Sequence, residues 1–241
     1  SGSIFSGSLV PTEPTFDVGE EVLIDWQVLH QGGSARTGVP FVVRVVHLAS
    51  QTALGEASFT LDLPVQGEQS GRSQFNGSGA ALGAYVATLS VSDNGQVLQL
   101  AEAAFQIVDA NPPLISILHP SPGALLGAGI VVRAGIVDAE TAVAAASVRI
   151  DGGVAMPMSA MPGTSHEYGS VPLDLEDGAH VADVAASDTA GNAATPQQVA
   201  FEVDRTPPEI RIGGVTDGER RNAPVVPTIE VIDAHLRDTQ I

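Results

Sequence analysis

Cysteine and lysine are both absent from this chain of 241 residues, and aromatic residues make up only 4% of it. Without cysteine, the fold cannot depend on disulfide bonds. Without lysine, it also cannot contain an internal Lys–Asn isopeptide cross-link. With so few aromatic rings, the hydrophobic cores must consist mainly of Val, Ile, Leu and Ala, which suits several small domains better than one large enzyme fold.

Basic side chains are scarce as well, and all of them are arginine. Ten basic residues stand against 28 acidic ones, so the formal net charge is −18. A surface this acidic repels nucleic-acid phosphates and anionic lipid, and we therefore expect no nucleic-acid partner. The same charge attracts divalent cations. The simpler alternative is that the acidity only keeps the protein soluble.

The sequence has no recognisable catalytic motif. It contains no His-Glu-x-x-His, no phosphate-binding loop and no Gly-x-Ser-x-Gly elbow, and its six histidines are not spaced as metal ligands. It also lacks a run of about 18 apolar residues that could span a membrane. We predict that this segment is not an enzyme and does not insert into a membrane.

The chain repeats itself with an offset of 95 residues. Residues 112–141 align without gaps on residues 207–236, and nine of the thirty positions are identical. A period of this length is the size of one immunoglobulin-like sandwich. The identical pairs are Pro112/Pro207, Pro113/Pro208, Ile115/Ile210, Ile117/Ile212, Gly123/Gly218, Ala128/Ala223, Val131/Val226, Asp138/Asp233 and Ala139/Ala234.

The repeat predicts the domain boundaries. We expect one sandwich over 1–109, a second over 110–204, and the N-terminal part of a third, truncated domain over 205–241. The two short linkers each contain a Pro-Pro pair, which holds the chain extended. We therefore expect an extended row of domains, with more chain following in the natural protein.

Alternating apolar residues predict strands throughout, so the fold class is all-β, with tandem Greek-key sandwiches. The clearest hairpin joins strands over 85–91 and 97–108 through Asn94-Gly95, which is typical of a two-residue turn. Residues 142–146 favour a helix but are too few to form one alone. In domain two we expect strands over 115–118, 130–137, 147–150, 166–173, 180–186 and 198–203.

Two stretches resemble known bacterial modules. Residues 175–192 contain an Asp-Gly turn, an alternating strand and then Asp-x-x-Gly-Asn, and residues 201–208 end a strand on Pro-Pro. Both are similar to the tandem immunoglobulin-like, or cadherin-like, domains of extracellular bacterial surface proteins. Tyr85 resembles the tyrosine corner of such sandwiches, and His180 stands at the comparable place in domain two. The resemblance implies an extracellular, cell-surface protein.

Calcium is the cofactor that we consider, at the first predicted domain junction. The topology of an immunoglobulin-like sandwich brings two loops of domain two to the end where its first strand begins, beside the linker. Calcium prefers six to eight oxygen ligands on loops that can wrap it. The candidate ligands are Asp109, Asn111, Asp138, Glu140, Asp188 and Asn192.

The second junction repeats this pattern in weaker form, with Asp204 and Asp233 as candidates and Asp238 as a further one. His235 replaces Glu140 there, and Arg205 lies next to Asp204 in the sequence. The competing interpretation of both junctions is that Asp and Asn only form turns by bonding nearby backbone amides.

The function that we expect is structural or adhesive. The segment would space and present a functional end of a large secreted or surface-anchored protein, stiffened by calcium. Its partners would be other domains of the same chain, and a protein or carbohydrate receptor. For a sugar site, only Tyr168 is a candidate, because Trp26 and Tyr85 are expected in cores. Two alternatives remain: accessory domains of a secreted peptidase or glycosidase, and a subunit of a surface assembly completed by strand addition.

Overall fold

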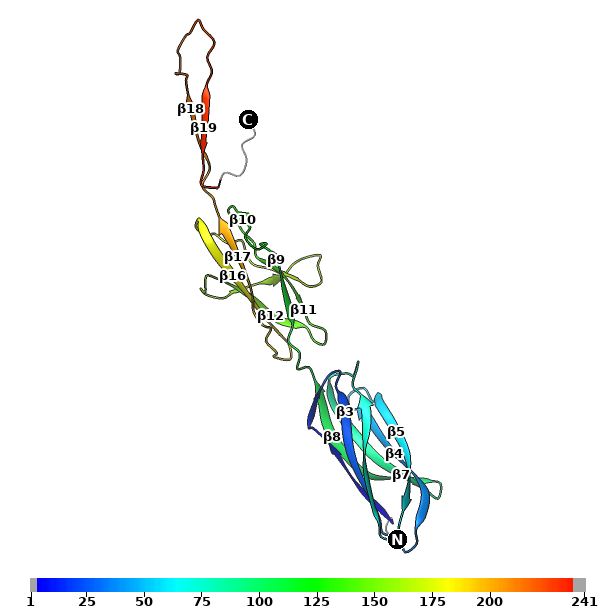
Figure 1. The fold of residues 1–241 in the computed structure, drawn as a ribbon. Helices are drawn as coiled ribbons and strands as arrows, with labels where there is room; N and C mark the ends of the chain where they lie inside the picture. The colour runs from blue at the N-terminus through cyan, green and yellow to red at the C-terminus, as the bar shows by residue number, and fades with distance from the viewer. Residues whose placement is uncertain (1–3, 236–241) are drawn as a thin grey trace. The chain divides into compact units, whose positions relative to one another are not determined.

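The computed structural model describes residues 4–235 and divides the chain into two units, Ser1–Asn111 and Pro112–Ile241. Every element along the described residues is a β-strand (Figure 1). None of these residues forms a helix that could cross a membrane. The predicted all-β class is confirmed, while the boundary near residue 204 and the extended arrangement stay predictions.

The first unit is a sandwich of two sheets. One sheet has the order β1-β3-β6 and the other the order β2-β8-β7-β4-β5. All neighbouring strands are antiparallel except β2 and β8, which are parallel. The strands of this unit are β1 Phe5–Pro11, β2 Thr15–Asp17, β3 Glu21–His30, β4 Arg36–His47, β5 Ala53–Leu63, β6 Glu68–Asn76, β7 Gly83–Asp93 and β8 Gln96–Val108.

Alternate residues of these strands form the core. Val22, Ile24 and Val28 of β3 are fully buried, as are Val43 and Val45 of β4. This is the alternation that the sequence predicts for a sheet with one covered face. Asn94-Gly95 forms the predicted turn between β7 and β8, with positive φ angles of 50° and 77° at its two residues.

The second unit contains a smaller sandwich and a separate hairpin. The sheet orders are β10-β17-β16-β12-β13 and β14-β15-β11-β9, while β18 and β19 form a two-stranded sheet. The strands are β9 Leu114–His119, β10 Leu125–Leu126, β11 Arg133–Val137, β12 Val143–Ile150, β13 Met156–Pro157, β14 Ser159–Ala160, β15 Glu167–Gly169, β16 Gly178–Asp188, β17 Gln197–Val203, β18 Glu209–Gly213 and β19 Thr228–Ile232.

Residues 142–146 form no helix, as expected for so short a stretch, and belong largely to β12 through antiparallel pairing with β16. Two expected strands of this unit are shorter than predicted. The strand expected over 130–137 begins only at Arg133, in β11. The expected strand over 166–173 is shorter, since β15 covers only Glu167–Gly169, and Leu173 forms an isolated bridge with Ile130.

The first unit has the hydrogen bond of a tyrosine corner, and the second unit has an equivalent bond made by a histidine. The Tyr85 hydroxyl donates to the carbonyl oxygen of Ala81 at 2.7 Å. His180, 95 residues later, places its Nε2 at 2.9 Å from the carbonyl oxygen of Glu176. In each unit a side chain at the start of the penultimate strand thus bonds the backbone four residues earlier, and His180 replaces the tyrosine.

The sequence repeat is also a repeat of strand register. In β9 and β11, Ile115 lies opposite Ile136. In β18 and β19, Ile210 lies opposite Val231, which is the same pair displaced by 95 residues. The hairpin β18–β19 is therefore a second copy of the pair β9–β11.

The two copies differ in what covers them. Ile115 is 9% exposed and belongs to the core of the second unit, whereas Ile210 is 63% exposed. Ile212 and Ile229 of the hairpin are exposed as well. The apolar face of β18–β19 thus has no covering layer among the described residues.

Candidate metal centres

Asp138 follows β11 and organises its own loop. Its Oδ1 accepts hydrogen bonds from the backbone amides of Glu140 at 3.1 Å and Thr141 at 2.6 Å, and from the Thr141 hydroxyl at 3.2 Å. The other oxygen, Oδ2, is buried and has no hydrogen-bond partner in the part of the chain that the structure describes. A buried carboxylate oxygen without a donor is unfavourable unless a cation or a proton reaches it.

Asp188 ends β16 and lies in a comparable turn. The residue is 2% exposed, and its Oδ1 accepts the backbone amides of Gly191 at 2.6 Å and Asn192 at 2.8 Å. The Asn192 side-chain amide donates to Oδ2 at 2.8 Å. Burial opposes ionisation of Asp188, but the hydrogen bonds from Asn192, Gly191 and Ala190 together hold its pKa below the ordinary value.

The two loops bring these acids together. Asp138 and Asp188 each offer a carboxylate oxygen, and the two atoms lie within 4.8 Å of each other. Both residues also form turns through backbone amides, as the competing interpretation expects. The turn geometry and a cation site are compatible, because the turns use Oδ1 of Asp138 and leave its Oδ2 without a donor.

The linker residues belong to the first unit and have partners there. The backbone amide of Asn111 donates to Asp109 Oδ1 at 2.9 Å, and its side-chain amide donates to Asp17 Oδ2 at 3.1 Å. Asp17 also accepts the backbone amide of Ala110 at 2.9 Å. That Asp109 and Asn111 share one calcium ion with the two loops stays a prediction, as do the ligand roles of Glu140 and Asn192.

Asp17 was not anticipated from the sequence. It reaches the linker because β2 pairs in parallel with β8, placing Asp17 opposite Val108. Such a pairing joins residues that are far apart in the chain, and no local sequence motif predicts it.

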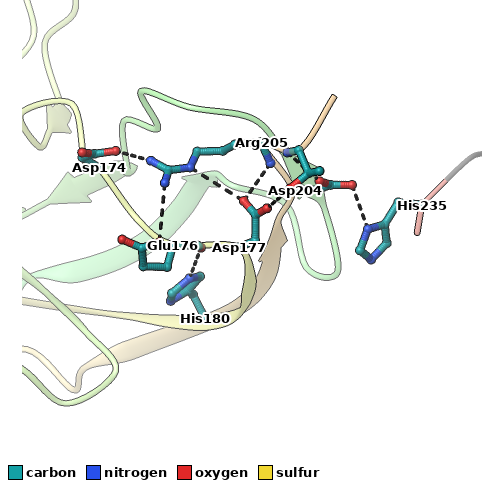
Figure 2. A network of polar contacts seen from close by, with 8 residues as sticks. Asp174, Glu176, Asp177, His180, Asp204, Arg205 and His235 are labelled. Carbon is teal, nitrogen blue, oxygen red and sulfur yellow. Dashed lines mark hydrogen bonds and ion pairs between the residues drawn. The ribbon is translucent and has the colours of Figure 1, made fainter. Parts of the chain in front are cut away.

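The candidates of the second junction form a compact cluster with a histidine. Asp204, Asp233 and His235 each offer one ligand atom, and these atoms lie within 4.8 Å of one another. His235 Nδ1 lies 2.8 Å from Asp204 Oδ2 (Figure 2), and its backbone amide donates to Asp233 Oδ1 at 2.7 Å. Asp238 lies outside the described residues.

A fourth residue, Glu202 of β17, completes this cluster and was missed. Its Oε1 lies 3.0 Å from His235 Nε2. Both ring nitrogens therefore face a carboxylate, which only the imidazolium form satisfies with two donors. The hydrogen bonds to Asp204 first, and then to Glu202, raise the pKa of His235 above its ordinary value.

Arg205, which we expected to weaken this cluster, directs its guanidinium group elsewhere. Figure 2 shows it among Asp174, Glu176 and Asp177, in the segment before β16. Its backbone amide donates to Asp177 Oδ1 at 2.8 Å. The arginine thus fastens the chain after β17 to that acidic segment, and its charge is shared among three carboxylates.

The aromatic residues considered for sugar binding are largely used in packing. Tyr85 is 2% exposed, and Trp26 stacks on Phe59 with ring centroids 4.4 Å apart. Tyr168, in β15, is half-buried and packs against the core of the second unit. A carbohydrate receptor therefore stays a prediction without a structural site.

Comparison with known proteins finds only distant structural similarities. No family model and no curated protein matches the chain. Among solved structures it is similar to the fibronectin(III)-like modules of Clostridium thermocellum CbhA, at 15% identity and a TM-score of 0.35 over 82% of this chain and 94% of that one. It is also similar to the CARDB domain of a Pyrococcus furiosus protein in complex with di-metal ions, at 14% identity and a TM-score of 0.34 over 43% of this chain and 87% of that one.

A third similar structure is the endo-β-1,4-mannanase from Thermotoga petrophila, at 19% identity and a TM-score of 0.34. That match covers 41% of this chain and 21% of the mannanase. These likenesses concern the fold alone. The strand orders described above assign it: the chain is an all-β protein built on immunoglobulin-like sandwiches.

Proposed function

We propose that this chain is a non-catalytic structural segment of a secreted or surface-anchored bacterial protein, which spaces and presents a functional end. The observation that carries the proposal is the repeated register of β9–β11 in β18–β19. A chain that builds the same strand pair twice at a fixed offset is organised by repetition of a module. Repeated modules that contact mainly their neighbours serve well as spacers.

Calcium is the proposed stiffening element. The support is that Asp138 and Asp188 bring carboxylate oxygens within 4.8 Å, while Asp138 Oδ2 is buried without a donor. Without a cation the two charges repel each other, and a bound ion would tie their loops together. The sequence analysis adds the linker residues Asp109 and Asn111 to the proposed calcium ligands, whereas the structural support concerns Asp138 and Asp188.

Thermal unfolding of the whole chain tests this role. After removal of metal with a chelator, millimolar calcium is expected to raise the melting temperature by several degrees, and magnesium is not. Binding to the folded state alone stabilises it by about 2.7 kcal/mol at a hundredfold excess over Kd. Small-angle scattering of the same samples is expected to show an elongated particle, with less variation in its dimensions when calcium is present.

Asp138→Asn is the informative variant. The asparagine keeps an Oδ1 that can accept the amides of Glu140 and Thr141, so the loop survives while the charge is removed. The calcium shift is expected to disappear. Asp62→Asn is the matched control, because Asp62 is exposed and accepts the backbone amide of Gly38 in the first unit, away from both clusters. A calcium shift that persists in Asp138→Asn contradicts the proposed site, and a compact particle contradicts the spacer.

A further inference from the structure

We infer that Asp204, Asp233 and His235 form a binding site for a divalent transition-metal ion such as zinc, oriented by Glu202. This inference goes beyond the proposed function, because it concerns a different cluster and a different class of ion. The residues come from two segments, the end of β17 and the loop after β19, both within the second unit.

The donor atoms are already close to the arrangement that zinc requires. One nitrogen and two carboxylate oxygens lie within 4.8 Å of one another. In a tetrahedral zinc site with bonds of about 2.1 Å, ligand atoms are about 3.4 Å apart. Small side-chain rotations therefore close the site around an ion, which takes the place of the proton between His235 Nδ1 and Asp204 Oδ2. A water molecule would fill the fourth position.

Glu202 supplies the orientation that such a histidine ligand needs. Its Oε1 is 3.0 Å from His235 Nε2, and its side chain is 46% exposed. When Nε2 carries the proton and donates to Glu202, the lone pair of Nδ1 points to Asp204. This carboxylate–histidine–metal arrangement is the usual way in which proteins fix the tautomer and the ring plane of a zinc-bound histidine. Glu202 is a positioning residue here, and it does not itself bind the ion.

The imidazole decides the class of ion. Calcium takes oxygen ligands almost exclusively and in larger number, whereas imidazole suits zinc, nickel, copper and iron. In the preceding repeat Glu140 stands where His235 stands here. The change from carboxylate to imidazole therefore shifts the preference of this cluster from calcium to a transition metal.

The arginine next to Asp204 does not pair with the carboxylates of this cluster. Arg205 is the nearest in sequence, and its guanidinium pairs with Asp174, Glu176 and Asp177. The carboxylates of Asp204 and Asp233 are bonded instead to His235 and to backbone amides. An arriving cation thus meets two negative groups and one imidazole.

Zinc titration of the whole chain, stripped of metal, tests the inference. A chromophoric chelator that competes for zinc reports the affinity and the number of sites. One site with a micromolar or tighter Kd is expected, unaffected by millimolar calcium. Cobalt in place of zinc is expected to give the visible absorption of a four- or five-coordinate ion with nitrogen and oxygen ligands.

Variants assign the site. His235→Gln is expected to weaken zinc binding at least tenfold and to remove the cobalt absorption. Glu202→Ala is expected to weaken binding about 10- to 100-fold while the site count stays the same, and Glu202→Gln, which keeps an acceptor, is expected to restore most of the loss. His180→Gln is the matched control, since His180 bonds one carboxylate and one carbonyl oxygen. It is expected to bind zinc as the parent does.

The inference is overturned if the parent chain binds no zinc at micromolar concentration, or if His235→Gln binds it as tightly as the parent. It is also overturned if calcium displaces zinc at equal concentration. Asp138→Asn separates this result from the proposed calcium site, because that variant is expected to lose the calcium response and to keep the zinc site.

Discussion

The imidazole ring of a histidine in the core of the first unit makes a single hydrogen bond among the described residues. His30 is 1% exposed, and its Nδ1 donates to the carbonyl oxygen of Pro64 at 2.8 Å. Its Nε2 is buried and has no hydrogen-bond partner among the described residues. The ring stacks on Phe5, with centroids 5.4 Å apart. Packing thus positions this ring as much as polar contacts do.

Gly32 is the residue that leaves room for His30. A Cβ atom at Gly32 would lie 2.5 Å from His30 Nε2. Gly32→Ala is therefore expected to lower the free energy of unfolding of the first unit by about 1–3 kcal/mol, measured by urea denaturation. Gly33→Ala is the matched control, because a Cβ there meets no described atom within 4 Å. A change within about 0.5 kcal/mol is expected for it, and equal effects of both variants would contradict the explanation.

His180 makes part of the stability of the second unit depend on pH. Its Nδ1 lies 2.7 Å from Asp151 Oδ2, and its Nε2 faces the carbonyl oxygen of Glu176. The hydrogen bond to Asp151, followed by that to Glu176, raises the pKa of His180 above 6.5. Because the folded-state pKa is the higher one, the contribution is complete below the unfolded value near 6.5 and is lost as pH rises through the folded value.

An NMR titration of the imidazole protons measures the pKa of His180 directly. The pKa of His180 is expected above the ordinary value in the parent chain and closer to it in Asp151→Asn. Urea unfolding is expected to show that His180→Gln costs more at pH 5.5 than at pH 8.5. A pKa at or below the ordinary value in the parent would contradict the assignment.

At the scale of elements, the duplicated strand pair offers a matched experiment. Ile115 in β9 and Ile210 in β18 are the same residue at the same register position, one 9% and the other 63% exposed. Ile115→Ala is expected to cost about 2–5 kcal/mol of unfolding free energy, because it leaves a cavity in the core. Ile210→Ala is expected to cost less than about 0.5 kcal/mol.

Chemical denaturation of the whole chain measures both variants. A loss at Ile210 as large as that at Ile115 would contradict the exposed position of the hairpin. It would mean that the apolar face of β18–β19 is covered in solution.

Some elements could be predicted from the sequence and others could not, for a physical reason. The hairpin β7–β8 is signalled by strict alternation and by Asn94-Gly95. In contrast, β6 contains almost only polar residues and glycine, and it is recognisable only through its pairing with β3. A strand of that composition forms because it pairs with a neighbouring strand, and its own sequence has no alternating apolar pattern that would predict it.

The candidate sites follow the same rule. Asp138 follows, and Asp188 ends, a strand that the local pattern reveals, so the approach of their loops could be predicted from topology. Asp17 becomes relevant only through the pairing of β2 with β8, and Glu202 only because His235, 33 residues later in the chain, lies beside it. The sequence therefore indicates which acids end strands, and tertiary structure decides which of them meet.

At the scale of the whole molecule, each unit has a core of its own. All eight strands of the first unit contribute buried residues to its core, and the second core is poorer in aromatic rings. Phe201 is the one fully buried phenylalanine of the second core, which otherwise consists mainly of Val, Ile and Ala. The second core thus agrees with the composition, whereas the first core gathers most of the chain's few aromatic rings.

The fixed offset between β9–β11 and β18–β19 also separates what the two copies share from what differs between them. Most of the thirty aligned positions differ between the two copies, yet the alignment needs no gap. One extra residue in either strand would turn its apolar side chains to the opposite face. What the two copies share is therefore spacing more than identity: the register of the pair is kept while most of its side chains differ.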